Sequence, residues 1–297
     1  MQRIISLLAS GTEIVCSLGA GHCLVGRSHE CDNPPWVRSL PCCTEPAFDV
    51  SVSSAAINAE VNRRLRASEP LYNVDTQRIR QLAPDLLITQ SHCEVCAVTP
   101  GNVTAPPAAQ LLALSAGSLE GVFQDIRHVA AAIGREDAGH ALVCREQQRL
   151  EVVKQRTANL RRPSLVMLEW TDPVFAMGNW GPELVEIANG ELLLGSKGQY
   201  SFAIAGERVL EVDPEYLIVA PCGYNLRRAL REQPVLEAFP WWPQLRAVRE
   251  GKVAFADGNL FFNRSGMTVT QTAEIIAEIL HGIVFGASTK GLYWQQL

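Results

Sequence analysis

Short apolar runs that alternate with helix-forming segments occur in both halves of the chain, and they constrain the fold more than any other feature. Seven such runs predict strands, at 3–8, 23–27, 85–90, 111–115, 164–170, 216–220 and 253–256. Helical spacing of apolar residues predicts helices between and after them, at 11–18, 76–82, 182–189 and 268–281. The 85–90 run is continuously apolar, which is typical of a strand buried on both faces of a parallel sheet. This alternation predicts an α/β fold.

The chain is long enough for two lobes. A length of 297 residues suits two units of ~100–150 residues each. Between the two halves, Ser118 can cap a helix that runs to Ile133, and the segment 135–162 contains no proline, so it predicts a second helix. A helix of ~25 residues would be ~37 Å long, which is enough to bridge two lobes.

We therefore predict two α/β lobes with central, parallel-type sheets, joined by one long helix and with a ligand cleft between them. The predicted parts are an N-terminal α/β lobe at 1–117, a helical tract that includes the interlobe helix at 118–162, and a C-terminal α/β lobe at 163–297.

Composition excludes several classes of protein. Hydrophobic residues make up 47% and charged residues 19%, so the chain can bury a core and is not disordered. The formal net charge of −5 argues against a nucleic-acid partner. No apolar run approaches the ~20 residues that a membrane-spanning helix needs, so we expect no insertion into a membrane.

The cysteines and the first residues of the chain bear on its location. Nine cysteines form an odd and unusually large set, whereas a secreted domain of this size favours an even, paired set. The apolar run 4–10 is interrupted by Glu13, which leaves it too short for the apolar part of a secretory signal. We expect a cytoplasmic protein.

Polar and aromatic residues gather directly after five of the predicted strands, where ligands bind in open α/β sheets. Rings presented at such edges would suit a large, flat and partly apolar ligand, and Arg264 could reach an anionic group or pair with an acidic neighbour. The candidate ligand-binding residues from this pattern are His29, Glu30, Trp170, Trp180, Tyr224, Phe262, Asn263 and Arg264.

The cysteines at the same strand ends leave three interpretations open. Cys93 and Cys96 form one CxxC pair, which Cys31 and Cys222 could complete as thiolate ligands of zinc or of an iron–sulfur cluster. A CxxC pair after a strand is also found in redox dithiols. Free cysteines are, in addition, among the most frequently buried residues, so these four could be structural.

Motifs of common enzyme classes are missing from the sequence. It contains no GxSxG elbow, no phosphate-binding GxxxxGK[ST] and no GxGxxG. We therefore expect a binding protein rather than a conventional enzyme. An enzyme that uses Glu30, Glu94 or Glu169 as acid or base stays an alternative.

Several motifs resemble those of a known family. They are Arg3-Ile-Ile-Ser-Leu7, Ser10-Gly-Thr-Glu-Ile-Val15, Leu18-Gly19, Leu24-Val-Gly26, Pro84-Asp-Leu-Leu-Ile88, Asp213-Pro-Glu-Tyr-Leu-Ile-Val219 and the segment 242–253. Together they resemble the cobalamin- and siderophore-binding proteins of ABC importers, the helical-backbone or type III class. The resemblance covers nearly the whole chain, implies two α/β lobes joined by one rigid helix, and adds Ser10 and Thr12 to the candidate ligand-binding residues.

Other motifs narrow this resemblance. The segments His29-Glu-Cys-Asp32, Cys93-Glu-Val-Cys96 and Pro221-Cys-Gly223 resemble a branch without a signal sequence that carries the label cobalamin-binding. Ala9 and Gly11 stand where the family more often has proline and alanine.

The resemblance implies a cytoplasmic protein that binds a corrinoid such as cobalamin, or a related metal-containing small molecule. Trp170, Trp180, Tyr224 and Phe262 would cover the macrocycle, and His29 or a cysteine would approach cobalt. The alternative is a thiolate protein that binds zinc or an iron–sulfur cluster, or an enzyme built on the same Cys, His and Glu residues. Because a cytosolic protein cannot deliver a ligand to an importer at the outer face, we do not expect an ABC permease as a partner.

Overall fold

The computed structural model describes residues 2–93, 95 and 97–297, which fold into two α/β units. The N-terminal unit comprises Met1–Ala116 and Glu120–Arg145, and the C-terminal unit comprises Gly117–Leu119 and Glu146–Leu297. The division between them falls inside helix α5 (Glu136–Thr157). The predicted helical tract 118–162 is therefore shared between the two units.

The N-terminal unit is built on a four-stranded parallel sheet with the order β2-β1-β5-β6. All four strands coincide with predicted apolar runs; they are β1 (Ile4–Ser6), β2 (Leu24–Arg27), β5 (Leu86–Gln90) and β6 (Gln110–Leu114). Every residue of β5 is buried, as its continuous apolar run predicted, because β5 lies between β1 and β6. In contrast, β6 is an edge strand and exposes its first residues.

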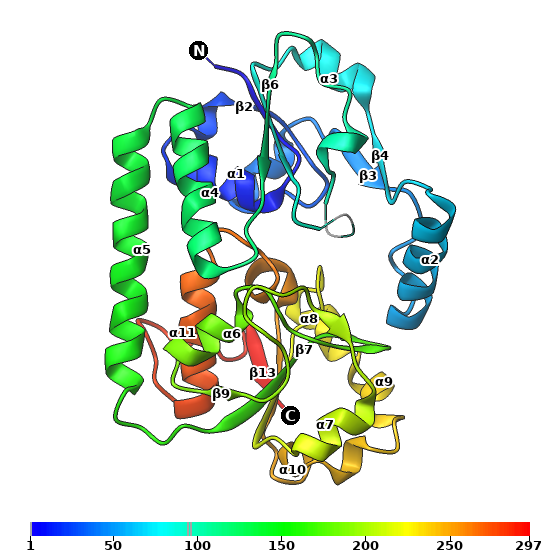
Figure 1. Ribbon diagram of the computed structural model, residues 1–297, viewed down its shortest axis with the longest axis vertical. Helices are drawn as coiled ribbons and strands as arrows, with labels where there is room; N and C mark the ends of the chain where they lie inside the picture. The colour runs from blue at the N-terminus through cyan, green and yellow to red at the C-terminus, as the bar shows by residue number, and fades with distance from the viewer. Residues whose placement is uncertain (1, 94, 96) are drawn as a thin grey trace. The chain divides into compact units, whose positions relative to one another are not determined.

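Helices and a small two-stranded antiparallel sheet complete the N-terminal unit (Figure 1). The helices are α1 (Ala9–Ser17), α2 (Ser54–Ala67), α3 (Thr76–Leu82), α4 (Leu119–Ala132) and the first part of α5. Strands β3 (Thr44–Pro46) and β4 (Tyr72–Val74) pair antiparallel outside the main sheet. Helix α1 follows β1 closely, and a methyl group at Gly11 would lie 2.7 Å from the Cγ2 atom of Ile88. Glycine at this position therefore allows α1 to lie close to β5.

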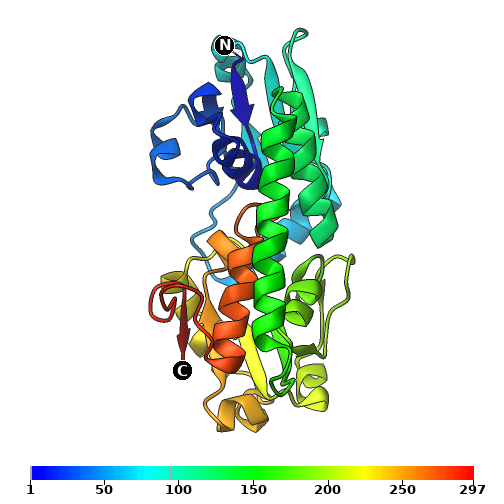
Figure 2. The same cartoon turned by 90° about the vertical axis from the view of Figure 1, so that its left-hand side faces the viewer.

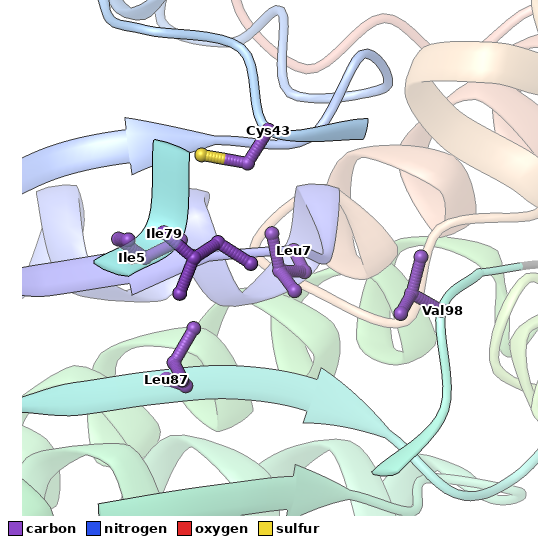
Figure 3. Packing of buried hydrophobic residues seen from close by; sticks show 6 residues of the cluster. All are labelled: Ile5, Leu7, Cys43, Ile79, Leu87 and Val98. Carbon is purple, nitrogen blue, oxygen red and sulfur yellow. The ribbon is translucent and has the colours of Figure 1, made fainter. Parts of the chain in front are cut away.

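A hydrophobic cluster joins the main sheet of the N-terminal unit to its smaller elements (Figure 3). Ile5 from β1 and Leu87 from β5 pack with Ile79 from α3, and Cys43 and Val98 extend the cluster into the neighbouring loops. Cys43 is therefore one of the small buried hydrophobic residues of this core.

The C-terminal unit contains a seven-stranded mixed sheet. Its parallel centre is β7 (Ser164–Thr171), β11 (Tyr216–Val219) and β12 (Val253–Ala256), all three predicted from their apolar runs. The remaining strands are β8 (Val174–Ala176), β9 (Glu191–Leu192), β10 (Phe202–Ala203) and β13 (Trp294–Gln296), of which β8, β10 and β13 pair antiparallel. The two-lobed α/β fold is thus confirmed, with one parallel and one mixed sheet.

Helices of the C-terminal unit connect these strands. They are α6 (Gly181–Ile187), α7 (Gly206–Val212), α8 (Leu226–Leu230), α9 (Gln233–Glu237), α10 (Arg246–Arg249) and α11 (Val269–His281). Helix α5 ends at Thr157, five residues before the predicted end, because the Asn189 side chain donates to the carbonyl groups of Thr157 and Leu160. In the part of the chain that the structure covers, we find no helix long and apolar enough to span a bilayer.

The register between β5 and β6 offers a matched test of this core. Leu87 and Leu111 are register partners, but Leu87 is 0% exposed and Leu111 is 36% exposed. We expect Leu87→Ala to lower the free energy of unfolding by about 2–5 kcal/mol, because it leaves a cavity in a buried strand. Leu111→Ala should cost less than about 1 kcal/mol. Urea denaturation followed by circular dichroism measures both, and equal losses would contradict the assigned burial.

Candidate functional site

Two aromatic residues and one arginine meet at the carboxyl edge of the C-terminal sheet. Trp170 lies near the end of β7, and Tyr224 lies in the loop that follows β11. Because β7 and β11 are parallel neighbours, their carboxyl ends lie at the same edge of the sheet. Asn225 then caps α8, with its side chain accepting from the backbone N–H of Arg228. The cap starts a helix that carries Arg228 one turn away from Tyr224.

The three side chains pack against one another, and this group of Trp170, Tyr224 and Arg228 is called the stack below. The ring centroids of Trp170 and Tyr224 are 5.2 Å apart with an interplanar angle of 59°. The Cζ atom of Arg228 lies 3.8 Å from the centroid of the Tyr224 ring, and its Nη2 donates to the Tyr224 hydroxyl at 3.0 Å. This is a cation–π contact reinforced by a hydrogen bond. Burial raises the pKa of Tyr224 although Arg228 opposes the shift, so the phenol is neutral near pH 7.

The end of β12 supports the Tyr224 loop. Residues Gly258–Phe262 form a short π-helix, η5, which Asp257 caps by accepting from the N–H groups of Asn259 and Leu260. The N–H of Asn259 donates to the carbonyl of Tyr224 at 3.1 Å. A Cβ at Gly258 would collide with the carbonyl oxygen of Pro221, so glycine is required for this close approach. Short π-helical turns of this kind are frequent at functional sites.

Asn263 and Arg264, two predicted ligand residues, make internal contacts at this edge. The Asn263 amide donates to the carbonyl of Ala220 at 2.7 Å and to that of Gly258 at 3.1 Å. Arg264 is buried, and its guanidinium donates to the backbone carbonyl and the side-chain oxygen of Asn259. The Asn263 side chain therefore ties η5 to the end of β11, and the Arg264 side chain stabilises η5 itself.

Two predicted aromatic residues are buried rather than exposed. Phe262 is 1% exposed, and Trp180, at the N-terminus of α6, is 6% exposed. Neither ring is presented at the surface of the folded chain. Trp170 keeps part of its surface accessible, whereas Tyr224 is buried under its neighbours.

In the N-terminal unit, His29 is fixed by a hydrogen bond through one nitrogen of its ring. Its Nδ1 lies 2.8 Å from the Thr44 hydroxyl, and its Nε2 lies 3.3 Å from a carboxylate oxygen of Glu30. The Tyr72 ring lies 5.5 Å away, centroid to centroid. Among the described residues, Nε2 is buried and has no hydrogen-bond partner, since the contact with Glu30 is an ion pair only when the histidine is protonated. Because Thr44 is buried, its hydroxyl is not accessible to a substrate.

Ser10, Thr12 and Cys31 are buried where α1 meets the loop after β2. The Thr12 hydroxyl donates to the Cys31 sulfur at 3.0 Å, and the Ser28 hydroxyl lies 3.3 Å from the same atom. Cys31 is 0% exposed, which is typical of a structural thiol.

The predicted thiolate cluster is divided between the units. Cys31 and Cys93 belong to the N-terminal unit, Cys222 belongs to the C-terminal unit, and Cys96 and Glu94 lie outside the described residues. The Gln90 side chain accepts from the backbone N–H of Cys93 at 2.7 Å and donates to the carbonyl of Cys93. Over residues 2–93, 95 and 97–297, no group of three or more His, Cys, Asp or Glu residues is placed to hold a metal ion.

Sequence reasoning missed Arg228, which belongs to a basic run with Arg227 and Arg231 that is typical of a solvated helix face. Only its spacing could have indicated a role, since it follows Tyr224 by four residues and Asn225, the helix cap, by three. That spacing places a side chain over the residue one turn earlier.

The chain matches a known protein family. A family model described as "Periplasmic binding protein" matches residues 4–260. No curated protein matches the chain.

Several solved structures are similar over nearly their whole length. One is a periplasmic heme-binding protein from Pseudomonas aeruginosa, with a TM-score of 0.70 and 18% identity over 99% of this chain and 97% of that chain. Another is the periplasmic vitamin B12 binding protein of Vibrio cholerae, with a TM-score of 0.64 and 17% identity over 94% and 96%. A third is an ABC transporter substrate-binding protein from Listeria monocytogenes, with a TM-score of 0.70 and 16% identity over 95% and 100%. At these identities the likeness shows the fold.

The half-buried thiol of Cys16 and the buried thiol of Cys43 give a test of the N-terminal unit. Burial raises the pKa of both Cys16 and Cys43 to about 11, whereas Cys144 is exposed. Because the thiolate is the reactive form, we expect iodoacetamide at pH 8 to modify Cys16 and Cys43 at least about 100-fold more slowly than Cys144. A time course read by peptide mass spectrometry measures the three rates. Comparable rates would show that the surroundings of Cys16 and Cys43 do not raise the pKa values of these thiols.

Proposed function

Because this chain belongs to the periplasmic binding protein family, we propose that it binds a small molecule, and that this ligand is a corrinoid such as cobalamin or a related metal-containing macrocycle. The observation that carries the proposal is the stack of Trp170, Tyr224 and Arg228 at the carboxyl edge of the C-terminal sheet. We propose in addition that the chain belongs to the cobalamin-binding branch whose members have no signal sequence.

The chemistry of the stack suits such a ligand. Trp170 supplies a partly accessible aromatic surface for the apolar face of a macrocycle. Arg228 supplies a guanidinium for acidic substituents on the rim of the ring. Its contact with Tyr224 fixes the direction of the guanidinium, so less conformational entropy is lost when a ligand binds.

The solved relatives support the ligand class. Their titles name heme and vitamin B12, and both are flat tetrapyrrole-type rings that carry a metal. Heme carries two carboxylates, whereas the ring substituents of cobalamin are amides. Both ligands therefore need an aromatic surface to pack against. Only heme carries carboxylates on its ring that a cation of the protein would pair with.

Two further expectations remain predictions. They are the cytoplasmic location and the lack of an ABC permease as partner. Fractionation of the producing cells tests the first, and co-purification with a permease would overturn the second.

The thiolate alternative is separable by metal analysis of protein purified without chelators. Zinc or iron near one per chain without a corrinoid or heme absorption band would favour it. Cobalt with a corrinoid band would favour the proposed function.

A pair of tryptophan variants tests the stack. We expect Trp170→Ala to weaken binding of cobalamin or hemin by at least about tenfold, because an aromatic anchor contributes on the order of 2 kcal/mol. Trp36→Ala is the matched control, since Trp36 is 48% exposed and belongs to the N-terminal unit, and its affinity should not change. Absorption titration and calorimetry measure both variants. If the wild-type chain binds neither compound, the proposed ligand class is wrong.

We expect substitution of Arg228 to affect the binding of hemin more than the binding of cobalamin. Arg228→Gln removes the positive charge beside Tyr224 and keeps a polar side chain of comparable length. We expect it to weaken hemin binding by about tenfold or more, since the loss of a charge-assisted hydrogen bond costs roughly 1.5–3 kcal/mol. Cobalamin should be affected less, because its ring amides carry no charge and its single anionic group is the phosphodiester of the nucleotide loop. An equal loss for both compounds would assign Arg228 to holding Tyr224 rather than to recognising an anion.

A further inference from the structure

The last residues of the chain form a return strand that lies outside the matched family region. That region ends at residue 260, and the C-terminal tail, defined here as residues 282–297, follows α11. The chain turns at Gly282, which has a φ of +69°, and comes back to place β13 antiparallel to β12. The tail is the red segment that ends at the C-terminus in Figure 2.

One carboxylate fastens this tail. Glu278 on α11 is 7% exposed and accepts from the hydroxyl groups of Ser288 and Thr289, from the backbone N–H of Thr289, and from the Trp294 indole at 3.2 Å. Burial opposes its ionisation, but these neutral donors outweigh that effect and lower the pKa of Glu278. The middle of the tail and its final strand are thus tied to one charged group.

The fastened tail touches the end of β12. The carbonyl of Tyr293 accepts from the N–H of Asp257 at 2.9 Å. The Tyr293 ring packs edge-on against Phe261, with centroids 4.6 Å apart. Asp257 caps η5 and Phe261 belongs to it, so the tail supports this turn at two points.

The π-helical turn η5 also holds the Tyr224 loop. The N–H of Asn259 in η5 donates to the carbonyl of Tyr224, and Gly258 lies against the carbonyl of Pro221. Tyr224 is the residue on which Trp170 and Arg228 stack. A contiguous set of contacts within one unit therefore links Glu278 to the aromatic stack.

We propose that Glu278 is a positioning residue for the ligand-binding edge: it fastens the C-terminal tail, and the tail holds η5 and the Tyr224 loop in place. Glu278 acts without touching the ligand. The ligand part of this inference rests on the proposed function, whereas the positioning part concerns the ligand-free chain.

The chain offers a matched control for this residue. Glu274 lies one turn earlier on α11, and both side chains line the same cleft of about 220 Å³ beside the tail. Glu274, however, pairs with Arg149 on α5, with both of its oxygens 3.0 Å from the guanidinium. Glu278→Gln and Glu274→Gln therefore remove the same charge from the same helix, and only the first disturbs the groups that hold the tail.

Hydrogen exchange of the full-length, ligand-free chain tests the positioning role. We expect Glu278→Gln to speed exchange in peptides covering 220–230 and 257–264 by about tenfold or more, because it weakens several charge-assisted hydrogen bonds at once. Glu274→Gln should leave both peptides at the wild-type rate. A folded Glu278→Gln variant with unchanged exchange at 220–230 would overturn the inference. Tyr293→Leu, which removes the ring contact with Phe261 and leaves Glu278 intact, serves if Glu278→Gln does not fold, and it should speed exchange in the same peptides.

Titration with cobalamin and with hemin separates the two proposals. If the wild-type chain binds one of them, Glu278→Gln should raise its Kd by about tenfold and Glu274→Gln should not. Unchanged affinity of Glu278→Gln would overturn the ligand part of the inference. If the wild-type chain binds neither, the proposed function fails, and the exchange result alone decides the positioning role.

Discussion

Parallel pairing of β7 and β11, and of β11 and β12, is the constraint on which the C-terminal unit depends. It brings three strand ends that are far apart in the sequence to one edge. Trp170 lies at the end of β7, Tyr224 in the loop after β11, and η5 after β12. The backbone groups of these loops pair with one another, as in the bond from Asn259 to Tyr224. The edge is therefore a rigid support, which suits a site that must present an aromatic surface at small entropic cost.

The strands of both sheets could be predicted because their apolar runs are continuous and bounded by polar turns. The run 85–90 shows why, since β5 is buried on every residue and only apolar side chains can fill such a strand. The short strands beside the parallel centre of the C-terminal sheet could not be predicted in this way. Strands β9 and β10 contain two residues each, which is too short for any periodicity. The tail could not be placed either, because its position depends on Glu278, which lies sixteen residues before Trp294, the first residue of β13.

The candidate site shows a different limit. Residue type and position after a strand identified Trp170 and Tyr224, which meet in space. The same criteria also selected Asn263 and Arg264, whose side chains hold η5, and Phe262, which is buried in the unit. Polar residues at a strand end must either face a ligand or satisfy the backbone groups of neighbouring loops. Sequence alone does not distinguish the two roles, because the partners are carbonyl groups at Ala220 and Gly258 that no side-chain pattern reveals.

The placement of β13 has a consequence for the solubility of the chain. Strand β12 is buried along its whole length and pairs with β11 on one side and β13 on the other. Without β13, its backbone N–H and carbonyl groups would form an open, apolar edge of the kind that recruits strands from other molecules. Gln295 and Gln296, which are exposed, end the sheet instead, in a strand of only three residues. The tail thus protects the sheet from aggregation at the edge where the chain ends.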